Sequence, residues 1–196
     1  YRNVENIVLV LKSKFPISNR FTAMLVNNWE FAPLLHIVSG APVTVTAGQD
    51  NSFTDVGNDR PNLVSGTSIY LNQPLRKGAG QANRGFLNPA AFAQVTAGCP
   101  TPLSPATCAG YGTYGNISRN SFRGPNLVQF DAQISRIFPI HESLAAVLRL
   151  EAFNVPNHPN FATPAAALTS STFGQISALA TGQNPRIFQG SIKLTF

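Results

Sequence analysis

The sequence predicts an all-β fold, more specifically a partial antiparallel transmembrane β-barrel with long extracellular loops. Three observations favour this class. Apolar and polar residues alternate with a period of two in several segments near both ends of the chain. Charged residues make up only 11% of the sequence, against about 25% in ordinary soluble domains. A long polar tract rich in Gly and Pro separates the two strand-rich parts, as the long loops of such barrels do.

The clearest predicted strand spans residues 127–138. Its apolar parity comprises Val128, Phe130, Ala132, Ile134 and Phe138, and its polar parity comprises Gln129, Asp131, Gln133 and Ser135. This alternation gives the strand one apolar and one polar face. Arg136 interrupts the apolar parity close to the strand end, where a long side chain can reach the lipid headgroups.

A second strand is expected at residues 143–154, after a short link at residues 139–142, so that the two strands form an antiparallel hairpin. Its apolar parity comprises Leu144, Ala146, Leu148, Leu150 and Ala152, and its polar parity comprises Ser143, Arg149 and Glu151. Each strand slightly exceeds the roughly 9–11 residues that a tilted strand needs to cross a bilayer. We expect an incomplete, curved sheet whose convex face exposes the apolar parity, with Val128, Phe130, Ile134, Leu148 and Leu150 on it.

Other strands are predicted at residues 186–196, 29–38 and 43–46, with a further candidate at 3–15 and a weaker one at 21–27. Pro33 would be awkward in a central strand, because it has no N–H to donate to a neighbour. We find no helical apolar period of useful length. The expected organisation is therefore a strand-rich part at 1–46, a loop region at about 48–125 and C-terminal strands at about 126–196.

Alternation alone fits two classes of protein. In a soluble sandwich, the apolar parity that contains Phe130 and Ile134 would pack against a second sheet. In a barrel that parity faces lipid, and the polar parity lines a wet interior. Strand length, low charge, long loops and the aromatic strand ends at Trp29, Phe138 and Phe196 favour the barrel. The alternative is a secreted all-β adhesion or surface-binding module.

Composition excludes some partners. The longest apolar runs, such as residues 7–11, are far shorter than the roughly 20 residues of a spanning helix. The net charge of +6 comes from 14 basic and 8 acidic residues that are scattered rather than clustered, so we expect no nucleic-acid partner.

The two cysteines, Cys99 and Cys108, lie in a stretch rich in Pro and Thr without His partners or a C-x-x-C spacing. A disulfide that closes an external loop fits this context better than a metal site. The alternative is two unpaired thiols. The disulfide would indicate an oxidising, extracytoplasmic location.

The sequence offers only weak candidates for metal-binding or catalytic residues. His158 has no second ligand at metal spacing, and a Pro-rich turn explains it better. Oxygen ligands that calcium would accept surround Gly57, but they lack the regular spacing of a calcium loop, which favours a solvated external loop. These residues are Asp50, Asn51, Asp55, Asn58 and Asp59. Arg149 and Glu151 are expected to join a charge network in the lumen. We therefore predict no catalytic residue, no metal site, no cofactor and no enzyme activity.

Several segments match one known family in order along nearly the whole chain. They are residues 28–30 (NWE), 39–45 (SGAPVTV), 50–52 (DNS), 57–62 (GNDRPN), 86–92 (FLNPAAF), 114–125 (YGNISRNSFRGP), 151–161 (EAFNVPNHPNF), 173–176 (FGQI) and 184–189 (NPRIFQ). With these segments the chain resembles the late barrel strands and loops of Oar-like TonB-dependent receptors. The segment at 157–161 is the most specific of them.

The resemblance implies a barrel of about 22 strands with an internal plug and, in this branch, an N-terminal carboxypeptidase-regulatory-like domain. The chain resembles only the last several strands, so we expect it to be a C-terminal fragment that cannot transport by itself. Its implied place is the outer membrane of a Gram-negative-type bacterium. The implied function is uptake of a scarce nutrient, a siderophore or a glycan, energised by TonB through the missing N-terminal part. The family fixes no substrate-binding residue, and none is assigned here.

The end of the chain predicts an assembly signal. Phe196 is a terminal aromatic residue, and Leu194 and Ile192 precede it at every second position. An open barrel has an unpaired edge that must find a partner in the membrane, and this pattern resembles the signal that outer-membrane proteins use. The expected partners are therefore the barrel-assembly machinery and outer-membrane lipid.

Overall fold

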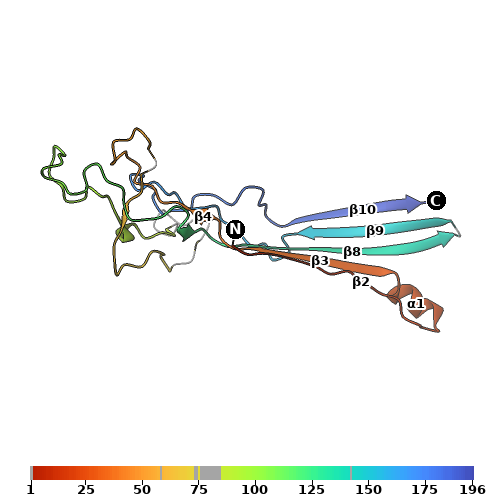
Figure 1. Ribbon diagram of the computed structural model, residues 1–196. Coiled ribbons are helices and arrows are strands. Elements are labelled where there is room, and N and C mark those ends of the chain that lie inside the picture. The colour runs from red at the N-terminus through yellow and green to blue at the C-terminus, as the bar shows by residue number, and fades with distance from the viewer. Residues whose placement is uncertain (1, 58, 73–74, 76–84, 142) are drawn as a thin grey trace. The chain divides into compact units, whose positions relative to one another are not determined.

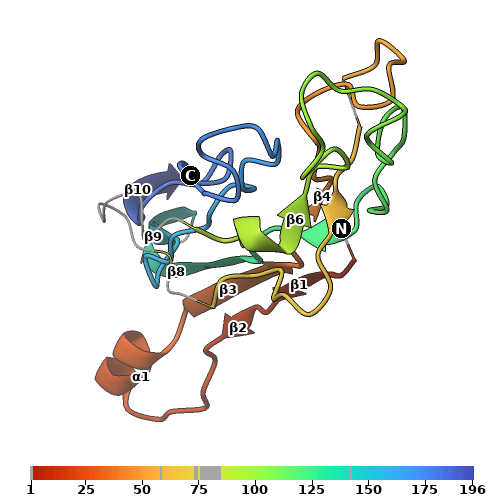
Figure 2. The ribbon, with the colours of Figure 1, turned by 90° about the vertical axis from the view of Figure 1, so that its left-hand side faces the viewer.

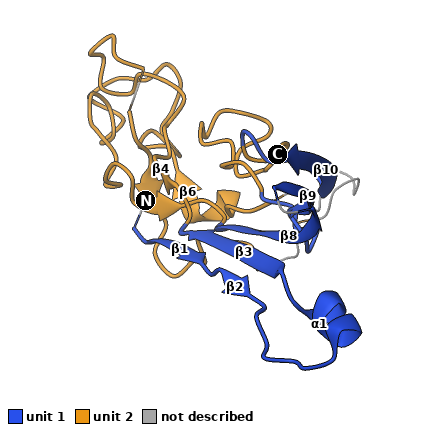
Figure 3. Cartoon of the chain, turned by 90° about the vertical axis from the view of Figure 1, so that its right-hand side faces the viewer, with its two compact units in different colours: residues 1–39, 126–160, 181–196 blue, residues 40–125, 161–180 orange. Residues whose placement is uncertain are grey.

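The computed structural model describes residues 2–57, 59–72, 75, 85–141 and 143–196. The chain forms two compact units (Figure 3): unit 1 comprises Tyr1–Ser39, Asn126–Asn160 and Thr181–Phe196, and unit 2 comprises Gly40–Pro125 and Phe161–Ala180. The strands of unit 1 pair with one another across two long connections, and both connections contribute to unit 2.

Unit 1 is an antiparallel sheet, and in the described part of the chain it contains six strands. Their bounds are β1 (Val4–Val8), β2 (Leu11–Lys12), β3 (Trp29–Val38), β8 (Leu127–His141), β9 (Leu144–Phe153) and β10 (Ile187–Thr195). The order is β1-β3-β8-β9-β10, and β2 also pairs with β3 (Figure 1). The strands predicted near both ends of the chain are thus present in one sheet.

The predicted hairpin is confirmed. β8 pairs with β9 in antiparallel register, and Ile134 lies opposite Leu150. Ile134 is 40% exposed and Leu150 52% exposed, so this pair does not pack into a dry core. Val128, Phe130 and Leu148 are half-buried. β8 continues past the predicted end to His141, with a register shift between Pro139 and His141. Glu142 of the predicted link lies outside the described residues.

Pro33 lies in a central strand after all, because β3 is paired on both sides. Pro33 has no N–H to donate, and the neighbouring strand is interrupted between β1 and β2 next to this position. Val8 pairs with Leu34 and Leu11 pairs with Phe31, so the register is the same before and after the gap. At the gap, the Leu9 N–H donates to the Pro33 carbonyl at 3.2 Å. The neighbouring edge strand breaks for two residues and then resumes.

The weak strand prediction at 21–27 is wrong: this segment contains helix α1 (Arg20–Val26). The Asn19 side chain caps its first turn by accepting hydrogen bonds from the Phe21 and Thr22 N–H groups. Seven residues are too few for a helical period to stand out in the sequence. Among the described residues, no helix is both long and apolar enough to cross a membrane.

Unit 2 contains short pairings and much irregular backbone. Strand β4 (Pro42–Val43) pairs with β7 (Phe122–Arg123), β5 (Asn62–Leu63) pairs with β6 (Phe92–Ala93), and the 3-10 helix η2 (Pro89–Ala91) precedes β6. The strand predicted at 43–46 is therefore shorter and shifted by one residue. Thr46 instead makes an isolated parallel bridge with Ala167.

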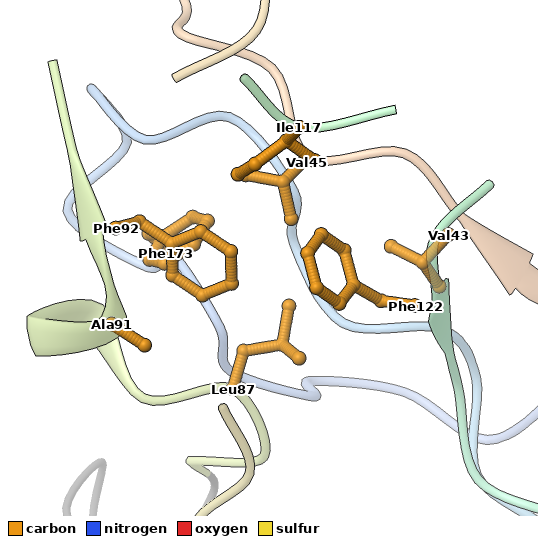
Figure 4. Close-up of a cluster of buried hydrophobic side chains, with 8 residues drawn as sticks. All are labelled: Val43, Val45, Leu87, Ala91, Phe92, Ile117, Phe122 and Phe173. Carbon is orange, nitrogen blue, oxygen red and sulfur yellow. The ribbon is translucent and has the colours of Figure 1, made fainter. Parts of the chain in front are cut away.

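A hydrophobic core holds unit 2 together, although most of its sequence, at about 48–125, was expected to form a loop region. The core residues are Val43, Val45, Leu87, Ala91, Phe92, Ile117, Phe122 and Phe173, and Figure 4 shows these side chains gathered around one centre. The Phe92 ring makes edge contacts with Phe122 and Phe173, both at 5.3 Å between centroids, worth about 0.5–1.5 kcal/mol each beyond burial.

Gly174 lets two segments of this core approach closely. Its carbonyl accepts hydrogen bonds from the Phe86 and Leu87 N–H groups at 2.7 and 3.0 Å. Its φ of +73° favours glycine, and a Cβ here would collide with the Leu87 carbonyl.

Candidate functional site

The candidate site is the sheet of unit 1, whose two faces differ in chemistry. Register places one apolar parity from every long strand on the same face. Its rows across the sheet are Ile7, Leu35 and Phe130; Pro33, Ala132, Ala152 and Phe188; Phe31, Ile134, Leu150 and Gly190; and Phe138, Ala146 and Leu194. We call this surface the apolar face. Among the residues that the structure describes, no second layer of strands covers Ile134 or Leu150, so the sandwich arrangement is not formed in unit 1.

The opposite surface, the polar face, carries polar rows through the middle of the sheet. They are Lys12, Glu30, Ser135, Arg149 and Ser191; Gln133, Glu151 and Gln189; and Asn6, His36 and Gln129. Hydrophobic residues remain on this parity, as where Leu34 lies opposite Asp131. A sheet with one apolar and one polar face can separate lipid from a wet interior.

Two pairs of opposite charges lie on the polar face. Lys12 Nζ lies 3.2 Å from Glu30 Oε2, and Arg149 Nη1 lies 3.9 Å from Glu151 Oε1. Lys12 is largely exposed and Arg149 about half exposed, so each pair contributes little to stability. Arg149 and Glu151, which were expected to join one charge network, thus lie close together, and Lys12 and Glu30 form a second pair on two other strands.

The connections distinguish the two ends of the sheet. At one end β8 passes to β9 through Glu142 and Ser143, and β2 passes to β3 through residues 13–28. At the other end, residues 39–126 join β3 to β8, and residues 154–186 join β9 to β10. Outer-membrane barrels have short periplasmic turns and long extracellular loops. We therefore call the end with the β8–β9 link the short-link end.

Arg136 lies on the apolar face at the short-link end, and it is only 8% exposed. Its guanidinium lies 5.0 Å from the centre of the Trp29 ring and 4.5 Å from that of Phe138. It also donates a hydrogen bond to the Met24 carbonyl. Two aromatic faces and a helix carbonyl therefore surround the charge.

The segment at 154–160 forms the turn after β9, and its asparagines hold backbone groups there. The Asn154 side chain accepts from the His158 N–H at 2.9 Å and donates to the His158 and Asn184 carbonyls. Asn160 is 2% exposed, and its amide pairs with both the N–H and the C=O of Val128 at 2.8 and 3.0 Å. It thus acts as a substitute strand partner for β8 beyond the end of β9.

The other sequence-predicted residues fall in different places. Cys99 and Cys108 form a disulfide, with Cα atoms 5.2 Å apart, in unit 2. His158 is exposed within the turn described above. No group of three or more His, Cys, Asp or Glu side chains that could hold a metal occurs among the residues that the structure describes.

The acidic cluster at 50–59 binds its own backbone. Asp59 Oδ2 accepts from the Asn51 and Ser52 N–H groups, both at 2.7 Å, and Asp50 accepts from the Thr54 and Asp55 N–H groups. Desolvation raises the pKa of Asp50, but these hydrogen bonds outweigh it and the net shift is downward from 3.8. The carboxylates thus order a turn, and Asn58 lies outside the described residues.

Sequence reasoning missed two features of the site. The contacts of Arg136 with Trp29 and α1 join residues far apart in the chain, and only the strand register brings them together. The pairing of Asn160 with Val128 was likewise hidden, although the Asn-rich segment itself stood out in the sequence.

These features define a class of protein: an antiparallel sheet with one lipid-compatible face, one polar face, and long connections concentrated at one end. The family comparison agrees, because the family model of the outer membrane beta barrel domain matches residues 8–189. The chain belongs to this family, and it is an outer-membrane protein. No curated protein and no solved structure matches the chain.

Proposed function

We propose that the chain is the membrane-spanning barrel segment of an Oar-like TonB-dependent receptor that takes up a scarce nutrient of the siderophore or glycan class. The observation that carries this proposal is the contrast between the faces of unit 1. The apolar face, in which Glu5 and Arg136 are the charged positions among the described residues, suits lipid, and the polar rows with two ion pairs suit the lining of a wet lumen.

Two further features support the proposal. The sheet is open in the described part of the chain, since β1 pairs only with β3 and β10 pairs only with β9. A closed barrel has no such edges, so an open sheet of this kind fits one segment of a larger barrel. The long connections at one end provide the extended external surface on which a receptor would capture its ligand.

The experiment tests energy-dependent uptake in the intact protein. Cells that express it are supplied with a panel of labelled iron–siderophore complexes and oligosaccharides, with and without a functional TonB. We expect accumulation of one ligand class that is lost without TonB. Accumulation that is equal in both strains, or absent for the whole panel while the barrel is folded in the membrane, would contradict the receptor proposal.

A thiol-labelling pair tests the face assignment separately. Gln133 and Ile134 are neighbours on β8 with opposite parity. We expect a water-soluble thiol reagent to label Gln133→Cys in cells, and Ile134→Cys to react only with a membrane-soluble one. The native Cys99 and Cys108 are disulfide-bonded and do not compete.

A further inference from the structure

Helix α1 and its flanks form an exposed apolar segment, residues 13–28, at the short-link end of the sheet. Phe21, Met24 and Leu25 are 71%, 62% and 51% exposed, and their spacing places them on one side of the helix. Phe15, in the approach to the helix, is also exposed. The segment contains Lys14 and Arg20 but no acidic residue.

The segment has a fixed structure. The Ser13 N–H donates to the Trp29 carbonyl at 2.9 Å, and the Trp29 N–H donates to Ser13 Oγ at 3.0 Å. The Asn27 side chain accepts from the Phe15 N–H and donates to the Phe15 carbonyl. An exposed apolar stripe on such an anchored element is an interaction surface rather than a frayed loop.

Hydrogen bonds between α1 and the sheet indicate on which face of the sheet the helix lies. Trp29 Nε1 donates to the Leu25 carbonyl at 2.9 Å, and Arg136 donates to the Met24 carbonyl. Trp29 and Arg136 are register partners on the apolar face. The C-terminal carbonyls of α1 are therefore bound from the lipid side of the sheet, and Figures 1 and 2 show α1 to one side of β3.

We propose that α1 is an interfacial helix that docks on the inner, periplasm-facing leaflet of the outer membrane. Phe21, Met24 and Leu25 insert at the boundary between headgroups and acyl chains, and Lys14 and Arg20 lie near lipid phosphates. An amphipathic helix with cations and large apolar residues lies in the plane of such an interface. Arg136 and Trp29 hold it there, at the level where aromatic residues gather in membrane proteins.

Continuity with the apolar face favours lipid over a protein partner. Trp29 and Arg136 form one row of the apolar face with Leu148, and the same two side chains bind the helix, so a bilayer that covers Ile134 and Leu148 would also reach α1. The basic charge and the absence of acids fit anionic phospholipid. The inference rests on the outer-membrane location, the face assignment and a periplasmic position of the short-link end, not on uptake or TonB.

A nitroxide label measures the depth of α1. The intact protein, carrying Phe21→Cys or the matched control Thr22→Cys one residue off the stripe, is placed in vesicles of phosphatidylethanolamine and phosphatidylglycerol. At position 21 we expect strong collisions with oxygen and loss of collisions with a water-soluble nickel chelate. At position 22 we expect more collisions with the chelate than at position 21.

Other collision patterns would overturn either the helix docking or the face assignment. Equal collisions with the chelate at positions 21 and 22 overturn the interfacial helix, as does a label at 21 shielded from both reagents, which would indicate a protein contact. Labels at Ile134→Cys and Gln133→Cys report the sheet separately: if Ile134 also contacts the chelate, the face assignment has failed, whereas a lipid signal at Ile134 with an aqueous signal at Phe21 rejects only the helix docking.

Discussion

Arg136 shows how a charged side chain is accommodated on a lipid-facing surface. Its guanidinium stacks on Trp29 and Phe138, and it binds the Met24 carbonyl. A lysine keeps the charge but has no planar group to stack between two rings. We expect Arg136→Lys to lower the free energy of unfolding by about 1–2 kcal/mol, measured by urea unfolding of the reconstituted barrel.

Arg149→Lys is the control for that substitution. Arg149 lies on the polar face of the adjacent strand, is about half exposed, and makes only a long ion pair with Glu151. The same chemical change there should alter stability by less than about 0.5 kcal/mol. Equal effects of the two substitutions would show that stacking on Trp29 and Phe138 does not stabilise Arg136.

Asp50 gives the turn at 50–59 a pH dependence. Since the folded pKa lies below 3.8, the stabilisation is fully present above that value and is lost as the pH falls through the folded pKa. We expect the amide proton shifts of Thr54 and Asp55 to titrate with a midpoint below 3.8, followed by NMR. Asp50→Asn should remove this titration, and a midpoint at or above the unperturbed value would contradict the hydrogen-bonded arrangement.

At the scale of elements, Asn160 determines how β8 begins. Its amide pairs with the backbone of Val128 and also donates to Gln183 Oε1 at 2.8 Å. Asn160→Ala would leave buried polar groups without these partners, so we expect a loss of about 1–3 kcal/mol in unfolding free energy. His158→Ala is the control, because the His158 backbone rather than its exposed side chain binds Asn154, and it should be near neutral in the same assay.

The long strands could be predicted because, once one face of a strand must be apolar, the alternating pattern determines which residues lie on that face. The hairpin of β8 and β9 and the terminal strand β10 follow from this alone. Helix α1 could not be predicted, because its bonds to Trp29 and Arg136 depend on strand register and its length is too short for a visible period. The position of Pro33 was misjudged because the sequence does not show how its neighbour is arranged. The adjacent edge strand is interrupted between β1 and β2, opposite the position where Pro33 has no N–H to donate.

At the scale of the whole molecule, the core of unit 2 was invisible in the sequence. Val43 and Val45 alternate as in a strand, but their partners Phe92, Phe122 and Phe173 come from three distant segments without a shared period. Only tertiary packing joins them. The contrast between the faces of unit 1 could be predicted, whereas a folded unit within the Gly- and Pro-rich tract could not.

Strand β10 lies at one open edge of the sheet, where closure of a barrel would take place. β10 has one free edge in the described part of the chain, and Phe196 is 95% exposed. If this strand is the element that the assembly machinery binds, Phe196→Ser should reduce the outer-membrane amount of the intact protein far more than Lys193→Ser, which lies on the polar parity. If the ring only anchors the barrel at the interface, its contribution is about 1.5–3 kcal/mol, and the variant would assemble normally but melt at a lower temperature. Heat-modifiable gel mobility of membrane fractions separates these results, and normal amounts of folded Phe196→Ser barrel would show that the terminal strand is not the signal.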